Sequence, residues 1–199
     1  MGEQQERQQF NACAHNDFKS NLTLLVCFVG ADVVRELLKA RPDFASKLDG
    51  QGFSPLHLAS SRGHAETTKE FLRLDPELCF QRDSEGRMPL HLAAIGGRVS
   101  VLNAIISTDL RLPWMLTKRR ETVLHLSVKN DQYEAVRYLV EKLDITNLVN
   151  FPDDDGNTIL HLAAAGKLTV ALELQVMTEK TLNSRGQVSY AMKSVGGLV

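Results

Sequence analysis

The sequence predicts an all-α solenoid in which about five helix-turn-helix repeats stack side by side, with the first and last repeats degenerate. The main evidence is the segment Leu-His-Leu, which occurs four times in 199 residues. Its histidines are His57, His91, His125 and His161, at steps of 34 (91 − 57), 34 (125 − 91) and 36 (161 − 125). A fixed period in this range indicates copies of one small unit, each burying its apolar face only against its neighbours.

A degenerate repeat precedes the four copies that contain histidine. Shifting the sequence by 34 residues places Pro42 on Pro76 and carries His57 to Thr23, so the period extends upstream of the first histidine. At the other end, the repeat pattern stops after Val176. The predicted parts are a leader at 1–19 that caps the first repeat, a repeat domain at 20–176, and a divergent tail at 177–199 that is a poor cap.

Each repeat should begin with a short helix formed by the Leu-His-Leu segment. The side-chain oxygen of Ser54 or Thr158 can cap this helix, and a proline such as Pro55 pre-sets the first turn. The helix should end at residues that tolerate a left-handed backbone, which are Gly63, Gly97 and Asp131.

A second helix follows, and a loop then leads to the next repeat. Apolar pairs recur in the second helix every 34 residues: Phe71 and Leu72, Ile105 and Ile106, and Leu139 and Val140. In three of the loops an aspartate stands three residues before a glycine, which is typical of turns: Asp49 and Gly52, Asp83 and Gly86, and Asp153 and Gly156. Helices of roughly 7 to 10 residues do not persist alone in water, so stacking must stabilise them.

The composition indicates a soluble chain and excludes several classes of function. A hydrophobic content of 43% permits a buried core, whereas a net charge of −1 gives no general attraction for nucleic acid or an anionic membrane. Three cysteines without a paired pattern indicate reduced thiols and a cytoplasmic location. The longest apolar run, at 22–29, is far shorter than the roughly 20 residues of a spanning helix, so we expect no direct membrane insertion by this chain.

The motif and its period resemble those of the ankyrin repeat, which has two helices, a β-turn and the signature Thr-Pro-Leu-His-x-Ala. The resemblance covers about residues 20–176. More narrowly, the 34-residue spacing and segments such as Arg41-Pro42-Asp43 and Glu121-Thr122-Val123 are similar to plant ankyrin proteins of the membrane-anchored PGG group. That resemblance implies a non-catalytic adaptor that binds another protein in plant defence or stress signalling. The alternative is the cytosolic sensor portion of a membrane-anchored regulator, shortened here, for which the family implies plasma-membrane association.

The four histidines in register suggest either a metal site or a structural role. Adjacent stacked helices lie about 8–10 Å apart, so equivalent imidazoles cannot converge on one ion through bonds of about 2 Å. We therefore expect each histidine to bond to the hydroxyl three residues earlier and to the backbone of the next repeat. Met88 supplies no hydroxyl, so His91 should be the least tethered of the four.

No catalytic or cofactor motif is present, so the sequence predicts neither an enzyme nor a bound cofactor or metal. Cys79, near His91, is a candidate nucleophile. In the repeat, Cys79 corresponds to Ala45, because 79 − 34 = 45, which favours a small packing residue over a reactive thiol.

The loop tips are the candidate partner-binding sites, because concave repeat surfaces suit protein recognition. Phe53 and Arg87 are residue types that often anchor interfaces. The predicted contact residues are Phe53, Arg87, Arg119, Arg120, Glu121, Asp155 and Asn157.

Two oppositely charged clusters lie one repeat apart in these tips. Lys118, Arg119 and Arg120 form a basic cluster, and residues 153–155 are three aspartates. They are either two independent exposed loops or a polarised groove that orients a charged partner segment. Arg120 also occupies the slot of Gly86, where a β-carbon strains a left-handed turn or forces a different one.

Overall fold

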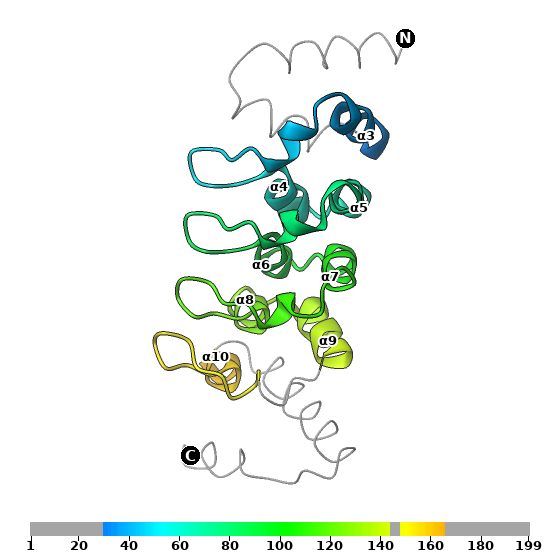
Figure 1. Cartoon of the computed structure of the whole chain (residues 1–199). Coiled ribbons are helices and arrows are strands. Elements are labelled where there is room, and N and C mark those ends of the chain that lie inside the picture. Colours follow the sequence, from blue (N-terminus) through cyan, green and yellow to red (C-terminus); the bar gives the residue numbers. More distant parts are fainter. Residues whose placement is uncertain (1–29, 144–147, 166–199) are drawn as a thin grey trace, which may run out of the picture.

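The fold is a stack of helix pairs, which confirms the predicted solenoid (Figure 1). The computed structural model describes residues 30–143 and 148–165. Within these residues the regular elements are all helical. They form three complete helix pairs, preceded by the second helix of one repeat and followed by the first helix of another. The predicted leader cap, the start of the first repeat and the tail fall outside the described residues.

The helices form two parallel rows. The inner row contains α4 (Pro55–Arg62), α6 (Pro89–Ile95), α8 (Val123–Lys129) and α10 (Ile159–Ala165). The outer row contains α3 (Ala31–Ala40), α5 (Ala65–Leu74), α7 (Val99–Ile106) and α9 (Tyr133–Lys142). Short 3-10 helices at Pro42–Ser46, Pro76–Phe80 and Leu112–Trp114 lead from the outer row to the next loop. Each helix packs against the next one in its own row, so contacts run from repeat to repeat.

The caps and turns of the inner helices follow the predicted chemistry. The Ser54 hydroxyl accepts a hydrogen bond from the backbone N–H of His57 at the start of α4, and Thr122 does the same for His125 in α8. Gly63, Gly97 and Asp131 all have positive φ, at 86°, 65° and 55°. The chain therefore reverses from inner to outer row at the expected positions.

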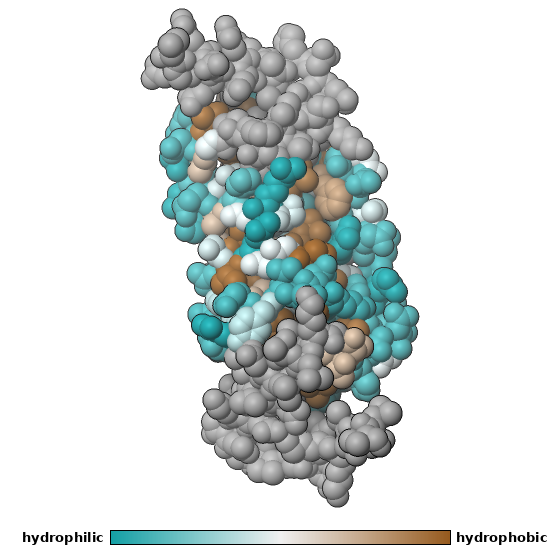
Figure 2. All heavy atoms as spheres, turned by 180° about the vertical axis from the view of Figure 1, so that it is seen from behind, coloured by the Kyte–Doolittle hydropathy of each residue, from teal (hydrophilic) through white to brown (hydrophobic). Residues whose placement is uncertain are grey.

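The core is the apolar surface enclosed between the two rows and between successive repeats. The predicted apolar pairs of the outer helices are all buried: Phe71 and Leu72, Ile105 and Ile106, and Leu139 and Val140. From behind, most of the described surface is hydrophilic, with hydrophobic residues in patches between hydrophilic ones (Figure 2). Stacking thus supplies the burial that the short helices need.

Two hydroxyl groups in the second repeat are buried in this core without a hydrogen-bond partner. They belong to Ser60 in α4 and Thr68 in α5. Apolar residues occupy the equivalent positions one repeat later, namely Ala94 and Leu102. The second repeat therefore contains a polar defect that its neighbour lacks.

Replacing Thr68 with valine is expected to raise the free energy of unfolding by about 1 kcal/mol, because the buried hydroxyl has lost its hydrogen bonds to water and makes none with the protein. The matched control is Thr122→Val, which removes a bonded capping hydroxyl and should lower stability by about 1–2 kcal/mol. Urea unfolding followed by fluorescence of Trp114, the only tryptophan, measures both. The interpretation of the defect is wrong if Thr68→Val is as destabilising as the control.

Candidate protein-interaction surface

Four loops project from the same side of the stack, beside the inner helices (Figure 1). We call them finger 1 (residues 47–53), finger 2 (81–87), finger 3 (115–121) and finger 4 (149–157). In finger 2, the Asp83 carboxylate accepts hydrogen bonds from the backbone N–H groups of Glu85 and Arg87. Asp49 and Asp153 close fingers 1 and 4 in the same way. The predicted turn role of the aspartates is confirmed.

Backbone hydrogen bonds join each finger to the next. The N–H of Ser84 donates to the carbonyl of Gln51 (3.0 Å), and the N–H of Lys118 donates to the carbonyl of Glu85 (3.0 Å). Finger 4 continues the series, because the N–H of Asp154 donates to the carbonyl of Arg119 (3.1 Å). The fingertips therefore form one continuous surface held at fixed spacing.

The motif histidines fasten this surface to the inner helices. The hydroxyls of Ser54 and Thr122 lie 2.8 Å from Nδ1 of His57 and His125 respectively, as predicted. Nδ1 of His57 also accepts the backbone N–H of Ser54, so the proton belongs on Nε2, which donates to the carbonyl of Arg87 (3.1 Å). His125 donates to finger 4 in the same way, and burial lowers the pKa of both histidines.

His91 has no hydroxyl contact, as the sequence predicted, whereas its rank relative to His161 stays a prediction. Met88, three residues earlier, has no hydroxyl, so Nδ1 of His91 accepts only the backbone N–H of Met88 (3.0 Å). Nε2 of His91 donates to the carbonyl of Met115 (3.0 Å). It therefore has one contact fewer than His57 or His125. It is also fully buried, which lowers its pKa to about 4. His161 contacts Thr158, and the residues after 165 are outside the described part.

Two of the predicted anchors contact each other. The Arg87 guanidinium lies over the Phe53 ring at 5.8 Å and forms an ion pair with the buried Asp83 at 2.8 Å. The Phe53 ring meets the His57 ring edge-on at a centroid distance of 6.0 Å. Both side chains are half-buried, so they form a rigid base between fingers 1 and 2.

Finger 3 keeps the shape of its neighbours with different residues. Thr117 stands in the aspartate slot, because 117 − 34 = 83, and its hydroxyl accepts the N–H groups of Arg119 and Glu121. Arg120 adopts φ 56° in the glycine slot, so the left-handed turn is retained. Its guanidinium lies 5.4 Å from the Phe151 ring centroid.

Arg120→Gly is expected to change the free energy of unfolding by less than about 1 kcal/mol. Glycine removes the strain of a left-handed conformation, which costs other residues about 1–2 kcal/mol. The substitution also removes the contact with Phe151 and makes the unfolded chain more flexible, and both effects oppose the gain. Gly86→Ala at the same repeat position should instead cost about 1–3 kcal/mol, because its β-carbon would lie 2.9 Å from the backbone nitrogen of Lys118. Urea unfolding of both variants tests this contrast.

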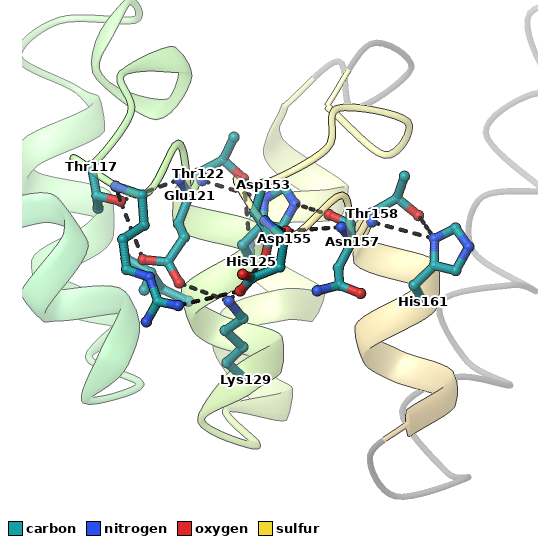
Figure 3. Close-up of polar contacts among 12 residues, drawn as sticks. Thr117, Glu121, Thr122, His125, Lys129, Asp153, Asp155, Asn157, Thr158 and His161 are labelled. Atoms are coloured by element: carbon teal, nitrogen blue, oxygen red, sulfur yellow. Dashed lines mark hydrogen bonds and ion pairs between the residues drawn. The ribbon is translucent and has the colours of Figure 1, made fainter.

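Glu121 was predicted as a surface contact, and this prediction is wrong. Its side chain is buried and accepts a hydrogen bond from Nζ of Lys129 (2.8 Å), which also binds Asp153 (2.9 Å; Figure 3). Burial lowers the pKa of Lys129, but these hydrogen bonds outweigh it and hold the pKa above the ordinary value. Asp153 is also buried, so the acidic cluster exposes only Asp154 and Asp155.

This ion cluster of Glu121, Lys129 and Asp153 is the feature that the sequence interpretation missed. Lys129 occupies the position of Ser61 and Ile95 in earlier repeats, because 129 − 34 = 95 and 95 − 34 = 61. The lysine at this position of the inner helix, where the earlier repeats have serine and isoleucine, was the sequence signal that could have revealed the cluster. The cluster joins the fourth repeat to finger 4.

The exposed charges of fingers 3 and 4 also meet. Nη2 of Arg119 lies 3.2 Å from a carboxylate oxygen of Asp155, and both side chains are more than half exposed. The Asn157 carbonyl is the acceptor for His125, and the Asn157 residue itself is half-buried. The basic and acidic tips are therefore not independent loops.

The described residues provide no support for a reactive centre. The Cys79 thiol is buried and donates to the carbonyl of Pro76, and burial raises its pKa to about 11, the opposite of an activated nucleophile. No group of three metal-binding side chains occurs in the described part of the chain. The helices in residues 30–143 and 148–165 are all too short or too polar to cross a membrane.

Comparison with known proteins agrees with this architecture. The family model described as ankyrin repeats (3 copies) matches residues 22–113 and 108–183. A search of curated proteins found no match. Ankyrin repeats are generally non-catalytic modules that bind other proteins. Because the matched residues cover most of the chain and the helix pairs stack as the repeat requires, this protein belongs to the ankyrin-repeat family.

Proposed function

We propose that this protein is an adaptor that binds another protein through the tips of fingers 1 to 4. The observation that carries the proposal is the backbone ladder between successive fingers, which presents their exposed side chains on one pre-organised surface. The outer helices carry charges that are largely paired with each other, as in Lys69 with Glu66 and Arg137 with Glu141. The fingers are therefore the better contact surface.

A pull-down from native tissue with the intact chain tests the proposal. The test variant combines Phe53→Ala and Arg120→Gly, which alter fingers 1 and 3. The matched control is Arg137→Ala, which removes one partly exposed arginine from the outer face of α9. We expect the finger variant to lose a partner that the control retains. Loss with the control alone would place the contact on the outer row and refute the proposal.

The role in plant defence or stress signalling, and the alternative of a sensor for a membrane-anchored regulator, both derive from the resemblance to the plant membrane-anchored group. The two roles differ in where the native protein resides. Fractionation of the native protein is expected to place it in the soluble fraction if it is a free adaptor. Recovery with the plasma membrane would favour the regulator.

A further inference from the structure

We propose that the edge formed by fingers 2 and 3 binds an acidic, carboxylate-rich segment of a protein partner. The binding groups are the side chains of Arg82, Lys118, Arg119 and Arg120. This inference rests on the proposed function, because it specifies the chemistry of the partner that the fingers recognise.

The first observation is that these cations are exposed and mostly lack acidic partners. Within the described residues, no carboxylate lies within ion-pair distance of Arg82, Lys118 or Arg120. Cations of the outer helices differ, because Arg35 and Arg73 share Glu70 and Lys39 pairs with Glu36. Positive charge is thus mostly paired on the outer row, whereas Arg82 of finger 2 and Lys118 and Arg120 of finger 3 have no ion-pair partner among the described residues.

The second observation is that two of the cations are held between neighbouring fingers. Arg82 donates to the carbonyls of Gly86 and Leu116, and Lys118 donates to the carbonyl of Ser84 (2.6 Å). These contacts fix both groups in place without removing their charge. A guanidinium has five N–H donors and an ammonium has three, so donors remain for a carboxylate.

The third observation is that this row already binds a carboxylate from its own chain. Asp155 of finger 4 lies 3.2 Å from Arg119, in an exposed pair that a ligand can displace. Glu121, the acidic residue next to Arg120, is buried against Lys129 and does not offset the charge at the tips. Asp155 therefore acts as an internal competitor for an acidic partner.

Because Asp155 competes for Arg119, removing the charge of Asp155 and removing the cations should change the affinity for an acidic peptide in opposite directions. Fluorescence anisotropy would follow the binding of the intact chain to a labelled peptide of alternating Glu and Ser. Arg120→Gly, Lys118→Gln and Arg82→Gln should each weaken binding about two- to fivefold, and added salt should weaken it further. Asp155→Asn should strengthen binding by a similar factor, because Arg119 is released. Arg137→Gln on α9 should leave the affinity unchanged.

Several results would overturn the inference. They are equal binding of a peptide with Gln in place of Glu, weaker binding by Asp155→Asn, or tighter binding of single-stranded RNA by the same cations. Circular dichroism of each variant shows whether the fold is kept. If the peptide test fails while the finger variant still loses its native partner in the pull-down, the adaptor role stands and only the acidic-ligand inference falls.

Discussion

Replacing Lys129 with methionine is expected to lower the free energy of unfolding by about 2–3 kcal/mol. The ammonium group binds both Glu121 and Asp153, whose side chains are only 10% and 1% exposed. Methionine keeps the aliphatic volume but leaves two buried carboxylates facing each other without a cation. Breaking a fully buried ion pair costs about 3–5 kcal/mol, and the 28% exposure of Lys129 reduces that figure.

The origin of this loss can be separated from a general effect of removing lysine. Lys142→Met changes an exposed lysine at the end of α9 and should stay within about 0.5 kcal/mol of the original protein. Adding Glu121→Gln to Lys129→Met should recover part of the loss, because one of the facing charges is then absent. If the double variant is less stable than Lys129→Met alone, the ion cluster is not the source of the stability.

Acidification from about pH 7 to about pH 5 is expected to destabilise the fold, with His91 alone contributing about 2 kcal/mol. The pKa of His91 is about 4 in the folded chain and 6.5 as its ordinary value. Between these values the unfolded chain binds a proton that the folded chain excludes, so stability is full above the unfolded pKa and falls as the pH approaches 4. Burial shifts the pKa of His57 and His125 in the same direction.

Urea unfolding at the two pH values measures this dependence, again through the fluorescence of Trp114. His91→Gln is the matched variant, because it keeps a polar side chain but cannot titrate. We expect it to be less stable than the original protein at pH about 7 and to lose about 2 kcal/mol less on acidification. The assignment to His91 fails if both proteins lose the same amount.

The regular parts of the fold could be predicted because each repeat uses the same local chemistry. Ser54 caps α4, Gly63 and Asp131 turn left-handed, and Phe71 is buried, all at positions fixed by the 34-residue period. The bonding of His91 could also be predicted, since the absence of a hydroxyl at Met88 is visible in the sequence. Local rules suffice where the interaction partner lies within a few residues.

The features at the surface that the sequence did not settle are those whose partner lies outside the local turn. Glutamate is a residue type that is common at solvated loop tips. Only the contact of Glu121 with Lys129, eight residues later, explains why Glu121 is buried. Arg119 and Asp155 are 36 residues apart, and their pairing depends on how finger 4 lies beside finger 3. Thr117 was predictable from its place in the aspartate slot, because its hydroxyl makes the same backbone contacts.

The central claim is that the fingers, and not the outer helices, contact the partner. Photo-crosslinking in native cells tests it most directly, with a photoreactive amino acid placed at Arg120 in finger 3 or at Arg137 on α9. The account predicts a crosslinked protein partner from position 120 and none from position 137. A partner crosslinked only from position 137, or equally from both positions, would contradict it.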